Sequence, residues 1–318
     1  MQQPPSDVPA RLREGLARVV VGGERVGFAL LVALLAGGHA LIEGVPGTAK
    51  TLTVRVLARL LGVSYGRIQF TPDLMPSDVV GTTVFDQRSA TFSFRRGPVF
   101  ANLLLADEIN RTPPKTQSAL LEAMEERRVT IDGTTYELPP PFMVCATQNP
   151  IEFEGTYPLP EAQLDRFFVR VRTGYPSAPD ERALIARTVA GFDARDLEGA
   201  GVVAVVNAAE LLEAQHAVRA IHVSESLQGY IYDIVAATRN TSDVALGASP
   251  RAALALVVAA QAAAYLDGRA FATPDDVKDV APAVLAHRII VRPEAELDGT
   301  NADEVVTRVL ASVPAPET

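Results

Sequence analysis

Apolar residues recur with two different periods over the first 190 residues of the chain. A spacing of three to four residues predicts helices over 7–19, 24–36, Thr51–Leu61 and Pro113–Arg127, the last of which begins with two prolines. Short apolar runs typical of buried strands separate these helices: His39–Glu43, Arg67–Phe70, Asn102–Ala106, Phe142–Thr147 and Phe167–Arg172. This alternation predicts an α/β domain whose parallel sheet is covered by helices on both faces.

Two segments interrupt the alternation and have the pattern of antiparallel strands. Residues 82–96 (TTVFDQRSATFSFRR) predict a hairpin that turns at Ser89–Ala90. Residues 128–138 (RVTIDGTTYEL) predict a second hairpin with a turn at Asp132–Gly133, a dipeptide that strongly favours a two-residue hairpin turn. We therefore expect two hairpin inserts in the α/β domain.

The character of the chain changes after Gly191. Residues 191–206 are rich in Gly, Asp and Val, and the chain that follows is rich in Ala and Leu with a helical period. Ser249–Pro250 and Thr273–Pro274 are typical helix starts, with a capping hydroxyl before a proline. The expected parts are a tail and entry helix (1–22), the α/β domain (23–190), a linker (191–206) and a small all-helical domain (207–318).

Composition restricts the class of protein. The 318 residues suffice for about two domains, and 48% hydrophobic and 21% charged residues are typical of a globular protein rather than a disordered one. There are 29 Lys and Arg against 38 Asp and Glu, a net charge of −9. This balance argues against broad, sequence-independent binding to nucleic acid, which needs many cations facing phosphates.

Neither a membrane span nor a zinc site is expected. The apolar stretch Val26–Ile42 approaches membrane-span length, but His39 and the adjacent Gly37 and Gly38 favour a buried helix, a break and a buried strand. Cys145 is the only cysteine and we expect it in the core; with an N-terminus unlike a signal peptide, it predicts a cytoplasmic protein. The four histidines show no metal-ligand spacing: His39, His216, His222 and His287.

The segment GVPGTAKT (44–51) has the setting of a phosphate-binding loop, because it follows a predicted strand and begins a predicted helix. Its two glycines allow backbone angles that turn successive N–H groups toward an anion, and the positive end of the helix dipole adds to them. Ala49 replaces the usual glycine before the lysine. We assign nucleotide binding to Gly44, Val45, Pro46, Gly47, Thr48, Ala49, Lys50 and Thr51.

Two side chains of this loop have separate roles. Lys50 supplies a full charge for the β- and γ-phosphates, and Thr51 offers a hydroxyl to Mg²⁺. The alternative is a Gly/Pro turn followed by a surface lysine. The chain has only three lysines in all, which disfavours a chance lysine at this position.

An acid pair ends an apolar run in LLLADEIN (103–110). The carboxyl end of such a strand is where open α/β sheets bind ligands. There, Asp107 can hold Mg²⁺ and Glu108 can polarise the attacking water as a general base. Alone, two acids after an apolar run can equally mark an ordinary strand end, and the preceding phosphate loop is what favours the catalytic interpretation.

From about residue 15 to 312, the chain resembles the AAA+ ATPases, and specifically the MoxR family. Three stretches carry the resemblance: DEINRTPPKTQSALLEAMEE (107–126), ATQNPIEFEGTYPLPEAQLDRF (146–167) and SPRA (249–252). It implies a P-loop α/β domain followed by a helical lid, ATP and Mg²⁺ as cofactors, and a homo-oligomeric ring, expected to be a hexamer. The guanine-specificity segment Asn-Lys-x-Asp is absent, which favours ATP over GTP.

The resemblance also implies roles for three residues that residue type alone leaves open. Asn149 resembles sensor 1, which orients the water between the general base and the γ-phosphate; the alternative is an Asn–Pro turn. Arg166 resembles the arginine finger, which stabilises transition-state charge in a neighbouring subunit. Arg251 resembles sensor 2, which contacts phosphate from the lid; for both arginines the alternative is a surface side chain.

The remaining assignments concern the edges of the site. The resemblance places Val21 and Gly22, with Val20, beside adenine, where backbone groups contact the base. Gln69 is a candidate restraint on the general base, and Arg111 is a second candidate at the subunit boundary. The two hairpins would face the pore or a partner, although solvated decoration is as good an interpretation for single residues such as Arg95 or Arg96.

The expected function is ATP hydrolysis that remodels or matures a client protein. In the MoxR family this is often metal-cofactor insertion or complex assembly, with a von Willebrand factor A-domain protein as partner. Two alternatives remain: a nucleic-acid motor, disfavoured by the net charge, and a nucleotide-dependent scaffold without turnover, disfavoured by intact Glu108, Asn149 and Arg166.

Overall fold

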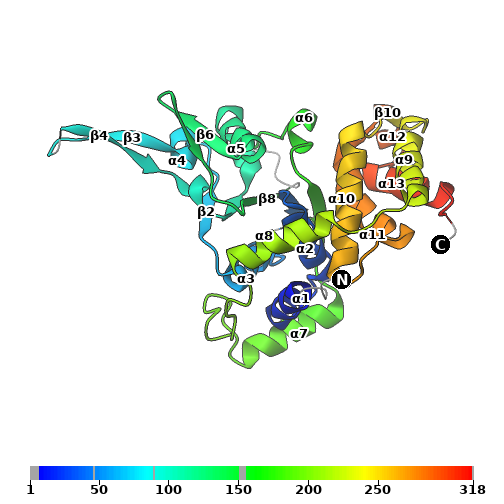
Figure 1. Ribbon diagram of the computed structural model, residues 1–318, viewed down its shortest axis with the longest axis horizontal. Helices are drawn as coiled ribbons and strands as arrows, with labels where there is room; N and C mark the ends of the chain where they lie inside the picture. The colour runs from blue at the N-terminus through cyan, green and yellow to red at the C-terminus, as the bar shows by residue number, and fades with distance from the viewer. Residues whose placement is uncertain (1–6, 46, 89, 150–154, 317–318) are drawn as a thin grey trace.

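The computed structural model describes residues 7–45, 47–88, 90–149 and 155–316. Five parallel strands form its central sheet in the order β2-β5-β8-β1-β9 (Figure 1). Their bounds are Ala40–Gly44 (β1), Tyr65–Gln69 (β2), Leu103–Asp107 (β5), Met143–Gln148 (β8) and Val169–Thr173 (β9). The five strands predicted from apolar runs are therefore present, and the predicted parallel sheet is confirmed.

Helices cover both faces of the sheet because successive side chains of a strand point to opposite faces. Ile42 and Leu105 belong to a core shared with α1, α2 and α3, whereas Leu41 and Leu104 belong to a core shared with α5. Cys145 lies buried in the first of these cores, as expected. The helices of this part are Val8–Val19 (α1), Glu24–Ala36 (α2), Lys50–Leu61 (α3), Pro76–Val80 (α4), Pro114–Glu126 (α5), Glu161–Leu164 (α6) and Ala178–Val189 (α7), with 3-10 turns at Pro98–Phe100 (η1) and Ile109–Arg111 (η2).

Both predicted hairpins form. One pairs β3 (Gly81–Asp86) with β4 (Thr91–Arg96), and the other pairs β6 (Arg128–Ile131) with β7 (Thr134–Glu137). The second turns at Asp132 and Gly133, whose φ angles of 49° and 79° match the predicted turn. Of the first predicted turn, Ser89 lies outside the described residues.

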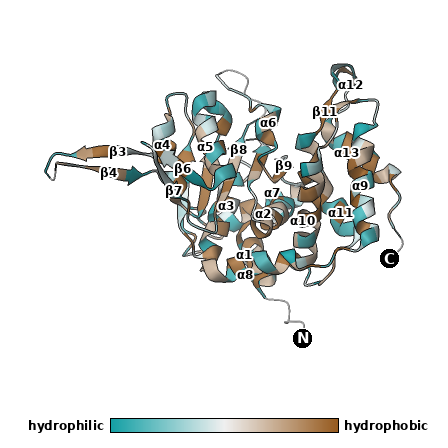
Figure 2. Ribbon diagram, turned by 45° about the horizontal axis from the view of Figure 1, so that its top comes forward, coloured by the Kyte–Doolittle hydropathy of each residue, from teal (hydrophilic) through white to brown (hydrophobic). Residues whose placement is uncertain are grey.

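The β3–β4 hairpin extends away from the rest of the molecule (Figure 1) and carries hydrophobic residues (Figure 2). Phe92 is 74% exposed and Phe85 is 48% exposed, and their ring centroids lie 5.0 Å apart. Phe94, nearer the base, stacks on Tyr136 of β7 at 4.3 Å, which joins the two hairpins. An exposed aromatic pair on a projecting hairpin is unusual for a surface that contacts only water.

The C-terminal part is a helical lid with one short antiparallel strand pair. The starts predicted at Ser249–Pro250 and Thr273–Pro274 are the N-termini of α10 and α11. Helix α10 packs against α2 in one hydrophobic core that continues from the α/β part. The elements are Ala208–Arg219 (α8), Glu225–Arg239 (α9), Val244–Leu246 (β10), Pro250–Leu266 (α10), Pro274–Leu285 (α11), Ala286–Arg288 (η3), Ile290–Val291 (β11), Pro293–Leu297 (α12) and Ala302–Ser312 (α13).

Residues 191–206 contain no helix or strand and lie along α3, the helix that follows the predicted phosphate loop. The backbone N–H groups of Val205 and Val206 donate to the carbonyl of Leu60, at 2.8 and 3.0 Å. Helix α8 follows and contacts α2, where Gln215 donates to the carbonyl of Leu34 at 2.7 Å. Both segments thus contact the α/β part, and the boundary between residues 206 and 207 stays a prediction. Throughout the described part of the chain, the helices are too short or too polar to traverse a lipid bilayer.

Candidate nucleotide-binding site

The loop between β1 and α3 is the predicted phosphate-binding loop. Gly44 ends β1, and a Cβ there would lie 2.5 Å from the carbonyl oxygen of Thr173, so only glycine fits. Gly47 has a φ of +83°. Ala49, where the sequence departs from the usual glycine, has a φ of 56° and therefore adopts a conformation that costs an L-residue about 1 kcal/mol or more. Strain retained in a loop of this shape is typical of a functional site.

Side chains fix this loop to its surroundings. The Thr48 hydroxyl donates to the carbonyl of Val45 at 3.0 Å and accepts from the hydroxyl of Thr173 at 2.9 Å, which ties the loop to the end of β9. The ammonium of Lys50 lies over the loop and donates to the carbonyl of Gly44. Pro46, assigned to nucleotide binding above, lies outside the described residues.

The two predicted metal ligands meet at the carboxyl edge of the sheet. The hydroxyl of Thr51, on α3, lies 3.3 Å from Oδ2 of Asp107, at the end of β5. Asp107 is largely buried, and its Oδ2 also accepts from Arg67 Nη2 at 2.8 Å. A hydroxyl and a carboxylate beside a phosphate loop are the hard oxygen ligands that Mg²⁺ prefers, so these residues fit that ion.

Thr147, on β8, connects the two acids. Its hydroxyl donates to Oδ1 of Asp107 at 2.7 Å and accepts from the backbone N–H of Glu108 at 3.0 Å. Sequence reasoning missed both Thr147 and Arg67. A signal existed for Arg67. Gln69 is opposite Asp107 in the β2–β5 register, and Arg67, two residues earlier on β2, points to the same face of the sheet as Gln69.

Glu108 is held in a constrained position directly after β5. Its φ is 57°, a left-handed value uncommon for a non-glycine residue. Oε2 of its carboxylate accepts from Gln69 Nε2 at 2.8 Å and pairs with Arg111 Nε at 3.2 Å. The expected contact with Gln69 is thus present. Arg111 lies beside the acid of its own chain in this structure.

Asn149 directly follows β8, the strand next to β5, and is buried. Its backbone carbonyl accepts from Asn110 Nδ2 at 3.4 Å. Because parallel strands end at the same edge of a sheet, Asn149 lies at the edge that also carries the acid pair and the phosphate loop. The structure therefore brings together the loop, both acids and the sensor 1 candidate.

A mainly apolar cavity of about 290 Å³ lies between α1, α2 and the first turn of α3, which follows the predicted phosphate loop. Its lining includes Val20 and Gly23 from the α1–α2 loop and Thr53 from α3. Val21 and Gly22, the predicted adenine neighbours, lie between the two lining residues of that loop. A small, mainly apolar cavity beside a phosphate loop has the character expected of a purine-base pocket.

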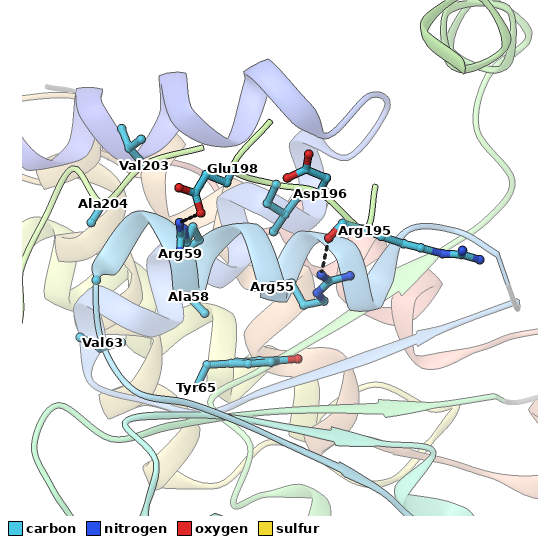
Figure 3. A pocket seen from close by; sticks show the side chains of 12 residues that line it. Arg55, Ala58, Arg59, Val63, Tyr65, Arg195, Asp196, Glu198, Val203 and Ala204 are labelled. Atoms are coloured by element: carbon cyan, nitrogen blue, oxygen red, sulfur yellow. Dashed lines mark hydrogen bonds and ion pairs between the residues drawn. The ribbon is translucent and has the colours of Figure 1, made fainter. Parts of the chain in front are cut away.

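A larger cavity, about 700 Å³, lies on the outer side of α3 under residues 191–206 (Figure 3). Here Arg59 pairs with Glu198 at 2.9 Å, and Arg55 donates to the carbonyl of Arg195 at 3.4 Å. Tyr65 also lines this cavity, and burial raises its pKa to about 12. The two α3 arginines already have partners, and the cavity is lined by the middle and the C-terminal part of α3 and by the segment after it, so we do not assign it to the nucleotide site.

The arginine finger and sensor 2 candidates lie together at the opposite end of the sheet. Arg166 pairs with Glu125 Oε2 at 3.2 Å, and Arg251 pairs with Glu125 Oε1 at 3.6 Å and with Asp165 Oδ2 at 3.4 Å. Asp165 and Arg166 precede the first residue of β9, whereas the other end of this strand, at Thr173, is opposite Gly44. The length of β9, about 13 Å, therefore separates this arginine cluster from the phosphate loop of the same chain.

Four features together define the AAA+ class of P-loop ATPases. They are the five-stranded parallel sheet in the order β2-β5-β8-β1-β9, the predicted phosphate loop after β1, the acid pair at the end of β5 and the helical lid. Family models agree: residues 39–169 match the "ATPase family associated with various cellular activities (AAA)", and residues 236–309 match the "AAA lid domain".

Similar proteins narrow the class further. "Uncharacterized protein YeaC" of Bacillus subtilis is 46% identical over 95% of this chain and 93% of its own length. "Chaperone MoxR1" of Mycobacterium tuberculosis is 45% identical over 94% of this chain and 80% of its own length. A solved structure named "putative ATPase", from Cytophaga hutchinsonii, is 42% identical, with a TM-score of 0.87 over 97% of this chain and 96% of that one. The chain belongs to the MoxR family of AAA+ ATPases.

Proposed function

We propose that the protein hydrolyses ATP and uses the energy to remodel or mature client proteins, as a chaperone-like member of its family. The observation that carries the proposal is the convergence of Lys50, Thr51, Asp107 and Glu108 at one edge of the sheet. The form of the work that we expect is metal-cofactor insertion or complex assembly, with a von Willebrand factor A-domain protein as partner, in the cytoplasm.

The phosphate loop would bind the β- and γ-phosphates through its backbone N–H groups and Lys50. Thr51 and Asp107 would hold Mg²⁺, which when bound neutralises phosphate charge. Arg67 and Thr147 fix the Asp107 carboxylate from two sides, so its oxygens keep their direction toward Thr51. The apolar cavity at Val20 and Gly23 would take the base, with Val21 and Gly22 beside it.

Glu108 would accept the proton of the attacking water. Gln69 and Arg111 hold its carboxylate at the mouth of the loop, and the bond from its backbone to Thr147 fixes its position relative to Asp107. Asn149, buried at the same edge, would orient the water. A base within hydrogen-bond reach of a positioned water contributes about 10²–10⁴-fold to turnover.

Arg166 and Arg251 would act on the nucleotide of a neighbouring subunit in a ring, for which we expect six members. Their place at the end of β9 opposite the phosphate loop supports this proposal, because neither reaches the loop of its own chain from there. The exposed Phe85 and Phe92 pair on the projecting hairpin is the surface that we assign to client or partner contact.

A trapping experiment tests the function. The Glu108→Gln variant should retain ATP and hold clients, so proteins that co-purify with it in ATP, but not with Lys50→Ala, would be clients. Phosphate release by the unaltered protein must be measurable in the same buffer. If the protein releases no phosphate even with the captured partner present, it acts as a nucleotide-dependent scaffold without turnover. If only single-stranded DNA stimulates phosphate release, a nucleic-acid motor is favoured.

A further inference from the structure

The finger candidate belongs to a chain of alternating charges that ends in the lid. Arg166 and Arg251 share the carboxylate of Glu125, at 3.2 and 3.6 Å. Arg251 also reaches Oδ2 of Asp165 at 3.4 Å, and Oδ1 of the same carboxylate pairs with Nε of Arg288 at 2.7 Å. Arg288 is the last residue of η3, in the lid. The two carboxylates thus link three arginines from both parts of the molecule.

Arg288 contacts the backbone on both sides of Arg166. Its side chain is only 4% exposed. Nη2 donates to the carbonyls of Asp165 and Phe167, at 3.3 and 2.9 Å, and Nη1 donates to the carbonyl of Phe168 at 3.2 Å. One guanidinium therefore holds the main chain on both sides of the finger residue. Its planar fork of five donors suits this task, and a lysine ammonium cannot reproduce it.

The neighbouring His287 adds a further bond to the same segment. It is buried, and its Nε2 lies 2.9 Å from the carbonyl of Phe167, so the ring donates there. Burial and the charge of Arg288 lower the pKa of His287 well below its ordinary value, and the ring is neutral. A buried cation is stabilised only by partners of good geometry. The Asp165 carboxylate and the three carbonyls therefore hold the Arg288 guanidinium in place, and the guanidinium in turn holds residues 165–168.

We propose that Arg288 is a positioning residue for ATP hydrolysis, which orients Arg166 and Arg251 toward the nucleotide of the neighbouring subunit by holding residues 165–168. This inference rests on the proposed function. Arg288 touches no phosphate itself; it acts through the segment that it holds, and it acts in the subunit that donates the arginines. Its loss must therefore slow turnover in the neighbour while its own phosphate loop still binds ATP.

The first measurement separates turnover from binding in Arg288→Met. We expect kcat to fall at least tenfold while the Kd for ATP, from titration calorimetry, stays within about twofold of the unaltered protein. Arg288→Lys keeps the charge but not the fork and should also lose turnover. A matched control is Arg269→Met, another lid arginine paired with a buried carboxylate, Asp276, at the far side of the lid. Arg269→Met should keep its kcat when compared at equal folded fraction, measured by circular dichroism.

Mixed assemblies give the decisive test, because they show in which subunit the residue acts. Arg288→Met mixed with Lys50→Ala should recover turnover, since a Lys50→Ala subunit offers a correctly held finger to a neighbour with an intact phosphate loop. Arg288→Met mixed with Arg166→Ala should recover nothing, because both lack a working finger. Arg166→Ala mixed with Lys50→Ala is the reference. If Arg288→Met does not fold, Arg288→Lys replaces it in the same mixtures.

The outcomes are distinguishable. Recovery of turnover in the mixture of Arg288→Met with Arg166→Ala would overturn the inference, and so would no recovery with Lys50→Ala when the reference mixture recovers. In both cases the proposed hydrolysis stands. If the reference mixture itself recovers nothing, Arg166 does not act across a subunit boundary, and the role of Arg288 fails with it.

Discussion

The two ends of the central sheet are built in different ways. At the carboxyl edge, the predicted phosphate loop is one continuous segment, 44–51, directly after β1. The acid pair lies at the end of β5, which β8 separates from β1 in the sheet. At the opposite end, the arginine cluster gathers Glu125 from α5, Asp165 and Arg166 from the segment between α6 and β9, and two lid residues. The proposed binding of nucleotide therefore depends mainly on local features of one chain, whereas the groups proposed to activate hydrolysis depend on lid packing and on a second subunit.

The largest expected effect comes from removing the finger. Arg166→Ala should reduce turnover by about 10³-fold, the scale of arginine fingers in other P-loop enzymes. ATP binding to the isolated subunit should be nearly unchanged, because Arg166 lies the length of β9 away from its own phosphate loop. Phosphate release and titration calorimetry measure the two quantities.

The same variant can break the comparison between the two ends. A clear loss of ATP affinity in monomeric Arg166→Ala would mean that Arg166 contacts the nucleotide of its own chain. A protein that sediments as a monomer with ATP at high concentration would remove the ring, and with it the subunit boundary that the cluster is proposed to serve.

A smaller loss is expected from the general base. Glu108→Gln keeps the side-chain size and can still accept from Gln69, but it cannot take the proton of water, so turnover should fall by about 10²-fold while ATP still binds. Glu126→Gln is a suitable control, because Glu126 is an acid that pairs only at the surface, with Arg128 at 2.9 Å. Turnover of Glu108→Gln at the rate of the unaltered protein would exclude Glu108 as the base.

The phosphate loop itself is tested by Lys50→Ala. Charge-assisted contacts to phosphate contribute about 1.5–3 kcal/mol, so ATP affinity should fall at least tenfold. Lys278→Ala, which removes a surface lysine paired with Asp275 in the lid, should leave affinity unchanged. Equal ATP affinities for Lys50→Ala and the unaltered protein in calorimetry would refute the loop assignment.

The sequence predicted the carboxyl edge well because its geometry follows from local rules. Parallel strands end at one edge, so a loop after one strand and acids after another must meet, and Thr51 and Asp107 do lie 3.3 Å apart. The hairpin at Asp132–Gly133 was predictable for the same reason, since the dipeptide specifies the turn. The roles of Asn149, Arg166 and Arg251 came from the family resemblance and stay predictions.

The arginine cluster could not be predicted from local pattern. Arg288 lies 123 residues from Asp165 in the sequence, and nothing in its own helix indicates a partner there. Thr147 was also missed, because a threonine within an apolar strand looks like ordinary core until the acids on the neighbouring strand are placed beside it. Such contacts depend on how the lid and the sheet pack, which periodicity does not report.

Acid should affect the two ends of the sheet unequally, because both buried histidines lie at the cluster end. His39 donates from Nε2 to the carbonyl of Met124 at 3.0 Å and accepts the N–H of Val144 at Nδ1, so a protonated ring would place two donors face to face. Burial lowers the pKa of His39 from its ordinary value near 6.5 to about 4, and burial also lowers the pKa of His287 well below that ordinary value. The unfolded chain binds these protons first, so the stability that the neutral rings provide is complete above pH 6.5. For His39 it is then lost as the pH falls toward 4, at about 1.4 kcal/mol per pH unit.

From pH 7.5 to 5.5, the free energy of unfolding should therefore fall by about 1.4 kcal/mol for His39. Turnover and ATP affinity at equal folded fraction should hold, because His39 stays neutral in the folded protein. His39→Gln can still donate to the Met124 carbonyl but does not titrate, so it should make the free energy of unfolding less sensitive to acid. His216→Gln, at an exposed position on α8, serves as the control and should change nothing. An equal decline in the free energy of unfolding in all three proteins would mean that His39 does not carry the acid sensitivity, and that this sensitivity does not arise at the cluster end of the sheet.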